Sequence, residues 1–126
     1  MNTYNDKTSI LKAVNNVQYA SGVTNTADAL LAVKTNVLIS QRGDRDAVRN
    51  VVIVLSDGQS SSKTQTIQAA SELHTVSDDV ISIVVGTNVD PVELTAIATD
   101  SHHVIDVRGF QALGSIIPKV LSVICS

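Results

Sequence analysis

The sequence is poor in aromatic residues and in cysteine, and both shortages restrict how a core can be built. Its 126 residues include two tyrosines, one phenylalanine and no tryptophan, yet 44% of them are hydrophobic. Valine, isoleucine, leucine and alanine must therefore fill the core, and β-branched residues in short runs are typical of strands covered on both faces. The single cysteine, Cys125, cannot form a disulfide within the chain. It is expected either to be a buried free thiol in the last helix or to pair with a cysteine outside this chain.

Several classes of protein are excluded by features that the sequence lacks. No apolar run approaches the roughly 20 residues that span a bilayer, and residues 1–6 do not resemble the start of a signal peptide. The net charge is −3 and the nine basic residues are scattered, so nothing indicates nucleic-acid binding. No Gly-x-Ser-x-Gly motif, phosphate-binding glycine-rich loop or Cys-x-x-Cys pair is present. The sequence therefore predicts neither an enzyme nor a membrane-spanning protein.

The spacing of the apolar residues predicts alternating helices and strands. Helices are expected at about residues 8–19, from 24–26 onward, 64–76, from 91 onward, and 110–124. Pro118 lies inside the last of these and should kink or restart it, because proline removes one backbone hydrogen bond. Strands are expected at residues 51–55, 80–85 and 103–107. The first strand has the continuous apolar profile of a central parallel strand.

The order of these elements predicts the fold class. Strands separated by helices of this length imply parallel βαβ units with right-handed crossovers. The fold class is therefore α/β, a doubly wound, Rossmann-like parallel sheet, in a single domain over residues 1–126. Two successive helices precede the first strand, and three strands are fewer than such a sheet usually has. The sequence thus predicts a sheet that lacks its N-terminal strands.

Asp57 occupies the position best suited to binding a ligand. In open α/β sheets, ligands bind beyond the carboxyl ends of the strands, and Asp57 lies directly after the 51–55 strand and before Gly58. Its carboxylate is either a metal or phosphoryl ligand or the cap of the following loop, and the residue pattern favours neither. Gln59 and the three serines at 60–62 add neutral oxygens that suit a hard cation such as Mg²⁺.

Two segments form motifs that occur together in one known family. Residues 51–60 read Val-Val-Ile-Val-Leu-Ser-Asp-Gly-Gln-Ser, and residues 22–30 read Gly-Val-Thr-Asn-Thr-Ala-Asp-Ala-Leu. The first resembles the hydrophobic strand and Thr/Ser-Asp-Gly of von Willebrand factor type A (VWA) domains. The second is similar to that family's Gly-x-Thr-x-Thr-x-x-Ala-Leu segment. Order and separation also fit, and the resemblance covers essentially the whole chain, most closely with extracellular-matrix and collagen-type members.

The resemblance implies a divalent cation, usually Mg²⁺, at a metal-ion-dependent adhesion site. The family's ligands are an Asp-x-Ser-x-Ser loop after the first strand, a threonine from the second motif and an aspartate from the third. On the matching positions of this chain, the threonine is Thr24 and the aspartate is Asp57. No Asp-x-Ser-x-Ser sequence occurs in the chain. The site is therefore expected to be incomplete, and Mg²⁺ is not expected to bind tightly.

The resemblance also implies that residues 1–126 are one partial domain. The family's first strand, first helix and next two strands would be absent from it. In the family, the strand at 51–55 lies beside that first strand, so here it is expected to be an open apolar edge. Such an edge invites strand exchange or oligomer formation. In many secreted members a cysteine after the last helix pairs with one before the first strand, which implies a disulfide from Cys125 to the absent region.

The function that the resemblance implies is non-catalytic adhesion. The chain would belong to a secreted or matrix protein and would bind extracellular-matrix or cell-surface proteins, including collagen-like ligands. Two alternatives are considered. A receiver-type signalling domain would use Asp57 as its phosphoryl acceptor, but the acidic pair and the lysine that such a domain needs are missing. An intracellular VWA assembly module would differ from the first interpretation mainly in compartment.

The histidines do not predict a second metal site. His102 and His103 are expected to enter the third strand, where adjacent side chains point to opposite faces and cannot converge on one ion. His74 lies in a predicted helix and is expected to be an ordinary surface residue.

Overall fold

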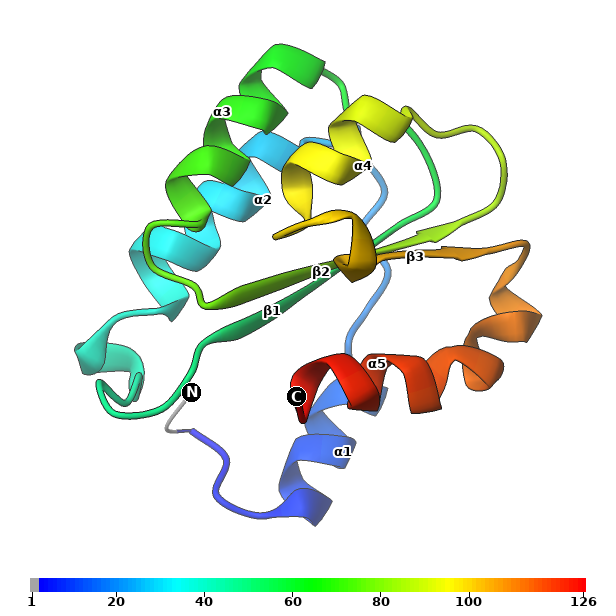
Figure 1. The fold of residues 1–126 in the computed structure, drawn as a ribbon. Helices are drawn as coiled ribbons and strands as arrows, with labels where there is room; N and C mark the ends of the chain where they lie inside the picture. The colour runs from blue at the N-terminus through cyan, green and yellow to red at the C-terminus, as the bar shows by residue number, and fades with distance from the viewer. Residues whose placement is uncertain (1–2) are drawn as a thin grey trace.

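The computed structural model describes residues 3–126, and in them three parallel strands carry helices on both faces (Figure 1). The strands are β1 (Val51–Ser56), β2 (Asp79–Val85) and β3 (Val104–Val107). The α-helices are α1 (Lys7–Asn15), α2 (Thr26–Ala32), α3 (Lys63–Leu73), α4 (Pro91–Ile97) and α5 (Ile117–Ile124). A π-helical turn at Val33–Val37 extends α2, and 3₁₀ turns cover Ser40–Arg42, Ser101–His103 and Phe110–Ile116.

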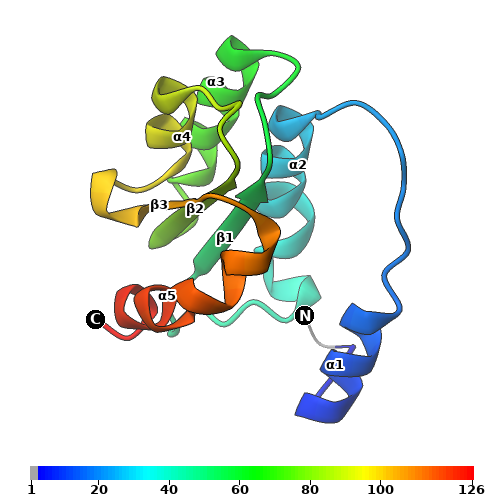
Figure 2. The same cartoon turned by 90° about the vertical axis from the view of Figure 1, so that its right-hand side faces the viewer.

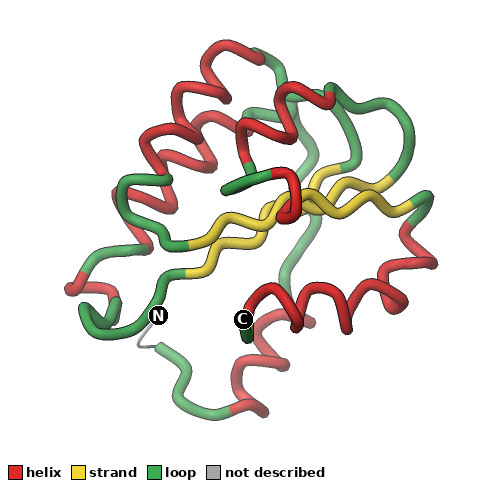
Figure 3. The backbone as a smooth tube through the Cα atoms, viewed as in Figure 1, coloured by secondary structure: helices red, strands yellow, loops and turns green. Residues whose placement is uncertain are grey.

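The sheet has the order β1-β2-β3, and both neighbouring pairs are parallel (Figure 3). Ile53 of β1 lies opposite Ile81 of β2, and Ser82 of β2 lies opposite Val104 of β3. Helix α3 connects β1 to β2, and α4 connects β2 to β3. The α/β class with parallel βαβ units is therefore confirmed.

Each face of the sheet has its own aliphatic core. Helices α2, α3 and α4 lie on one face and α5 on the other (Figure 1). Strand β2 is buried along its whole length, because it has a strand on each side and helices above and below. The first core consists of Ala27, Leu30, Ala69, Ala70, Leu73, Val80 and Ile97, and the second is built around Ile81, Ile83, Ile105 and Val107.

Helix α1 contributes to neither core. It begins at the predicted cap, where the Asp6 carboxylate accepts a hydrogen bond from the Ser9 backbone N–H at 2.9 Å. It ends at Asn15 rather than at the predicted residue 19, and none of its residues is buried. Figure 2 shows α1 standing apart from the sheet at the end of a long connector to α2. Without packing against another element, nothing offsets the entropy lost by ordering a further turn.

Strand β1 is an edge strand with one packed face and one open face. Val52 and Val54 pack against the core under α2 and α3. Ile53 and Leu55 lie on the α5 side and are 48% and 54% exposed. The expectation of a central strand is therefore wrong for β1, because no strand within residues 3–126 pairs with its outer edge. The structure does have the open apolar edge that the family resemblance implies.

The last helical segment is divided where the sequence predicts. Phe110–Ile116 forms 3₁₀ turns, and α5 starts at Ile117 with Pro118 in its first turn. Proline is tolerated there because its missing N–H would have no partner in the helix. No helix within residues 3–126 has both the length and the hydrophobicity needed to cross a membrane.

Candidate metal site at the carboxyl end of the sheet

Asp57 follows β1 directly and is exposed to solvent. The turn that holds it is fixed by its neighbours. The Ser56 hydroxyl donates a hydrogen bond to the Gly58 carbonyl at 3.0 Å, and the Gly58 N–H lies 3.4 Å from the same hydroxyl oxygen. The backbone of this loop is therefore ordered while the Asp57 carboxylate stays accessible.

The end of β2 lies against this turn. Gly86 follows β2 and has a φ of 107°, a left-handed conformation that glycine adopts without strain. A Cβ on Gly86 would lie 4.0 Å from the Asp57 carbonyl oxygen, and one on Gly58 would lie 3.8 Å from the Asn88 carbonyl oxygen. The carboxyl ends of β1 and β2 thus meet at Asp57, as expected for parallel neighbours in an open sheet.

Two hydrogen bonds join Thr24 to the same loop. The Ser61 backbone N–H and the Ser61 hydroxyl both donate to the Thr24 carbonyl oxygen, each at 2.9 Å. Thr24 itself is exposed, one residue before Asn25, whose side chain caps α2 by accepting from the Asp28 N–H at 3.2 Å. The structure therefore holds the backbone of Thr24 against Ser61, in the loop that begins at Asp57.

Glu93 is a structural element of the site that the sequence did not reveal. It lies in α4, is only 5% exposed, and its carboxylate accepts a hydrogen bond from the Ser60 backbone N–H at 3.2 Å. Asp90 caps α4, and the Lys63 ammonium group donates to it at 2.6 Å, which holds the pKa of Asp90 below its usual range. The Asp-x-x-Glu spacing of a capping box marks this turn, but not the contact with Ser60.

The residues present do not fit a tightly bound divalent ion. Mg²⁺ requires near-octahedral oxygen coordination, and the loop at residues 57–62 contains a single carboxylate, that of Asp57, while its other side-chain oxygens are neutral. Within residues 3–126, no group of three or more histidine, cysteine, aspartate or glutamate side chains is placed to hold a metal.

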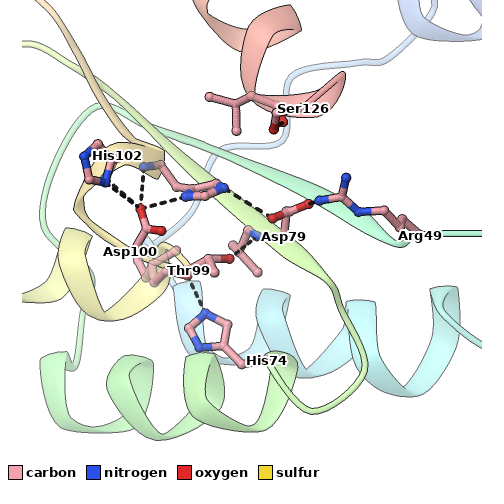
Figure 4. Close-up of polar contacts among 11 residues, drawn as sticks. Arg49, His74, Asp79, Thr99, Asp100, His102 and Ser126 are labelled. Carbon is pink, nitrogen blue, oxygen red and sulfur yellow. Dashed lines mark hydrogen bonds and ion pairs between the residues drawn. The ribbon is translucent and has the colours of Figure 1, made fainter.

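A second polar cluster lies at the opposite, amino end of the strands (Figure 4). His103 Nδ1 lies 2.8 Å from Asp100 Oδ1, and His103 Nε2 lies 3.3 Å from Asp79 Oδ1. Asp79 also forms an ion pair with Arg49. The hydrogen bond from His103 is the main reason why the pKa of Asp100 lies below its usual range.

The predicted divergence of His102 and His103 is wrong. Both belong to the 3₁₀ turn before β3, and the backbone N–H groups of both donate to the Asp100 carboxylate. His102 Nδ1 and His103 Nδ1 lie 3.6 Å and 2.8 Å from the same Asp100 oxygen, so the two rings face one carboxylate. In a strand, the side chains of His102 and His103 would point to opposite faces. Capping by Asp100 places both residues in a 3₁₀ turn instead. His74 is exposed, as predicted, and its Nε2 lies 2.9 Å from the Ile97 carbonyl oxygen.

Cys125 lies at the C-cap of α5 and is exposed. The buried-thiol interpretation is therefore wrong, because the end of α5 is not covered by another element. An exposed thiol is accessible to a second cysteine.

Comparison with known proteins identifies the family. The family model for the von Willebrand factor type A domain matches residues 1–119. The chain belongs to the VWA domain family. The resemblance found in the Gly-x-Thr-x-Thr and Ser-Asp-Gly motifs is confirmed.

VWA-containing matrix proteins are among the relatives. The chain is 31% identical to the collagen alpha-4(VI) chain of Mus musculus over 125 residues, which covers 95% of this chain and 5% of that protein. It is 33% identical to the collagen alpha-1(XX) chain of Mus musculus, with 99% of this chain and 9% of that protein covered. It is 27% identical to von Willebrand factor A domain-containing protein 2 of Xenopus laevis, over 99% of this chain and 15% of that protein. The chain thus spans a small part of each relative.

Solved structures agree with the VWA fold. Proximal thread matrix protein 1 from the mussel byssus superposes with a TM-score of 0.92 at 25% identity, over 98% of this chain and 32% of that chain. A second structure of the same protein, described as having a zinc-occupied MIDAS motif, gives a TM-score of 0.86 at 28% identity, over 98% of this chain and 30% of that chain. A manganese-loaded Plasmodium vivax TRAP protein matches at a TM-score of 0.62 and 19% identity, over 89% of this chain and 46% of that chain, and shows the fold alone.

Proposed function

We propose that this VWA chain is a non-catalytic adhesion module of a secreted extracellular-matrix protein. Its ligands would be matrix or cell-surface proteins, with collagen-like proteins as the first candidates. Homology to collagen chains and to a byssal matrix protein supports both the compartment and the class of partner. Exposed Cys125 agrees with an oxidising compartment, where it would pair with a cysteine outside residues 1–126.

Residues 1–126 would supply part of a VWA domain and about half of its metal site. The observation that carries this proposal is the double hydrogen bond from Ser61 to the Thr24 carbonyl, which fixes Thr24 against the loop of Asp57. These two residues are too few for Mg²⁺, and the remaining ligands would come from an Asp-x-Ser-x-Ser loop outside residues 1–126. Once bound, the ion would supply a coordination position for a carboxylate of the partner protein.

A synthetic peptide tests this division of the site. The peptide carries an apolar strand followed by Asp-x-Ser-x-Ser, and calorimetry measures Mg²⁺ binding to chain 1–126 with and without it. We expect Mg²⁺ and the peptide to strengthen each other's binding, since both would occupy one site. A peptide with alanine in place of its aspartate should lose the effect, as should the chain variant Asp57→Ala.

The matched control is Asp46→Ala, which removes an exposed carboxylate from the loop before β1, at the opposite end of that strand from Asp57. It should behave like the original chain. Peptide-dependent Mg²⁺ binding that survives Asp57→Ala would contradict the proposed role of Asp57. For the adhesion function itself, the chain with peptide and Mg²⁺ should bind immobilised collagen and be released by a chelator. Collagen binding that neither the chelator nor Asp57→Ala affects would refute metal-mediated adhesion.

A further inference from the structure

The loop between β1 and α3, residues 57–62, is held from the side by the first turn of α4. In the middle of this loop, the Ser60 backbone N–H donates a hydrogen bond to the Glu93 carboxylate at 3.2 Å. Directly after the loop, Lys63 at the start of α3 donates to the Asp90 carboxylate at 2.6 Å. Asp90 is the N-cap of α4, and Glu93 lies in its first turn. Two carboxylates of one helical turn therefore hold the loop at two points.

Glu93 is the better shielded of these two anchors. It is 5% exposed, whereas the side chains of Lys63 and Asp90 are 43% and 25% exposed. An ion pair that solvent and salt can reach is weakened by both. A hydrogen bond from a backbone N–H to a buried carboxylate is assisted by the charge and strengthened by the low local dielectric. The contact between Ser60 and Glu93 is therefore the main link between the loop and α4.

This contact uses the backbone of Ser60 and not its side chain. The Ser60 hydroxyl oxygen is buried and has no hydrogen-bond partner among the described residues. Burying a hydroxyl without a partner costs free energy, so the side chain does not favour this position. The bond to Glu93 therefore holds the loop backbone here, and the serine hydroxyl can be removed without removing that bond.

Helix α4 presents Glu93 from a firmly packed position. Leu94 and Ile97 are buried, and α4 packs against α3 and β2. Figure 1 shows α4 beside α3 on one face of the sheet. The Asp90 carboxylate accepts hydrogen bonds from the backbone N–H groups of Val92 and Glu93, which fixes the first turn. The place of the Glu93 carboxylate is therefore set by the core and not by the loop.

The backbone that Glu93 holds lies close to both candidate ligands of the metal site. Ser60 follows Asp57 by three residues in the same short loop. The next residue, Ser61, donates both of its hydrogen bonds to the Thr24 carbonyl oxygen. Without the bond at Ser60, the backbone on either side of it would gain freedom. Ligands at a binding site are commonly oriented by residues that do not themselves touch the bound group.

We propose that Glu93 is a positioning residue for the Asp57 loop, and that α4 is coupled through it to whatever this loop binds. Its role is indirect: the carboxylate orders the backbone at Ser60, and the ordered backbone presents Asp57 in one arrangement. Coupling of this kind is reciprocal, so a change in the position of α4 loosens the loop, and a ligand bound to the loop restrains α4. The ordering of the loop is independent of the proposed adhesion function, whereas its effect on ligand binding rests on that function.

Hydrogen exchange of the metal-free chain tests the ordering directly. Glu93→Ala removes the acceptor, so the Ser60 amide should exchange about tenfold faster or more, as expected for the loss of a hydrogen bond to a charged group. The Ser61 amide should also exchange faster, because the loop moves as a unit. Glu93→Gln should keep slow exchange at both positions, since an amide oxygen also accepts a hydrogen bond. Glu93→Asp keeps the charge but shortens the side chain, and should behave like Glu93→Ala.

Two matched controls separate this role from general stability. Ser60→Ala removes the buried hydroxyl and keeps the backbone N–H, so the amide at position 60 should stay protected. Glu72→Ala removes a helical glutamate that pairs with Lys34 at 3.1 Å, at the far end of α3 from the loop, and should leave both loop amides unchanged. Amides of the buried strand β2 should exchange as slowly in the Glu93 variants as in the original chain, which shows that these variants are folded.

Three exchange results would overturn the proposal. Unchanged exchange at Ser60 in Glu93→Ala would show that the bond does not hold the loop. Faster exchange at Ser60 alone, with Ser61 unchanged, would show that Glu93 binds one amide without ordering its neighbours. Equal acceleration in Glu93→Gln and Glu93→Ala would show that the negative charge, and not the hydrogen bond, is responsible.

Calorimetry with the Asp-x-Ser-x-Ser peptide then connects the loop to the adhesion proposal. Glu93→Ala should lower the peptide-dependent affinity for Mg²⁺ by about tenfold, the lower end of what residues outside a coordination shell contribute, and Glu93→Gln should not. Full affinity in Glu93→Ala despite faster exchange would overturn the coupling between α4 and the site. Absence of Mg²⁺ binding in every variant, together with the expected exchange results, would refute the adhesion proposal and leave the ordering of the loop by Glu93 confirmed.

Discussion

Two isoleucines in register across the sheet allow a test of how open the β1 edge is. Ile53 and Ile81 are direct neighbours on β1 and β2 and face the same side. Ile81 is 0% exposed and Ile53 is 48% exposed. Residue type, sheet and face are thus matched, and burial is the main difference. Replacing each isoleucine with alanine measures how much its side chain contributes to the free energy of unfolding. The difference between the two values reports how much stability β1 lacks because its α5-side face is only partly covered.

The expected costs follow from these exposures. Alanine lacks three carbons of isoleucine, and at about 0.8 kcal/mol for each buried methylene this is about 2.4 kcal/mol at a fully buried site. The cavity left inside a core raises the cost of such changes to about 2–5 kcal/mol, so Ile81→Ala should fall in the upper part of this range. Ile53→Ala forfeits about half of the transfer contribution, roughly 1 kcal/mol, and opens no closed cavity.

Urea denaturation measures the difference. With a slope of about 2 kcal/mol per molar urea, a difference of about 3 kcal/mol separates the two midpoints by about 1.5 M. The experiment is done at a concentration where the chain sediments as a monomer, because association would stabilise the folded state. Equal costs at the two positions would refute the reasoning, since they would mean that Ile53 is covered within a single chain.

Two further changes probe the loops. Gly86→Ala should destabilise the chain by about 1–2 kcal/mol, because of the left-handed φ of Gly86, whereas Gly58→Ala meets only ordinary contacts and should cost less in the same denaturation assay. Asp100→Asn should lower stability at neutral pH. The pKa of Asp100 is lowered by its hydrogen bond from His103, so its contribution is present above the unfolded pKa and is lost as the pH falls through the folded pKa. The free energies of unfolding of wild type and variant should therefore become equal in acid. A difference that stays constant with pH would show that the hydrogen bond from His103 to Asp100 is not its cause.

The sequence predicts the parts of the fold that depend on local pattern. The aliphatic runs define β1, β2 and β3 to within about two residues, and Pro118 marks where α5 begins. The end of α1 is not predictable in this way, because the last turn of a helix depends on packing, and α1 has none.

The site shows the same division between local and tertiary information. Thr24 and Asp57 are predicted from motifs whose spacing belongs to the family, and in the structure the Thr24 carbonyl is hydrogen-bonded to Ser61, in the loop that begins at Asp57. The contact of Glu93 with Ser60 spans 33 residues and has no local pattern. His103 was predicted to lie in the third strand, because the sequence does not show that Asp100 caps a 3₁₀ turn before that strand. Each of these contacts depends on how distant or competing elements pack.

The central claim is that residues 1–126 carry about half of a metal coordination shell. Titration of Mg²⁺ alone into this chain, followed by calorimetry, tests it most directly, with Asp57→Ala as the comparison. The account predicts no binding of micromolar or better affinity, and identical traces for the two proteins. Micromolar binding that disappears in Asp57→Ala would contradict it, because Thr24, Asp57 and their neighbours would then form a complete site.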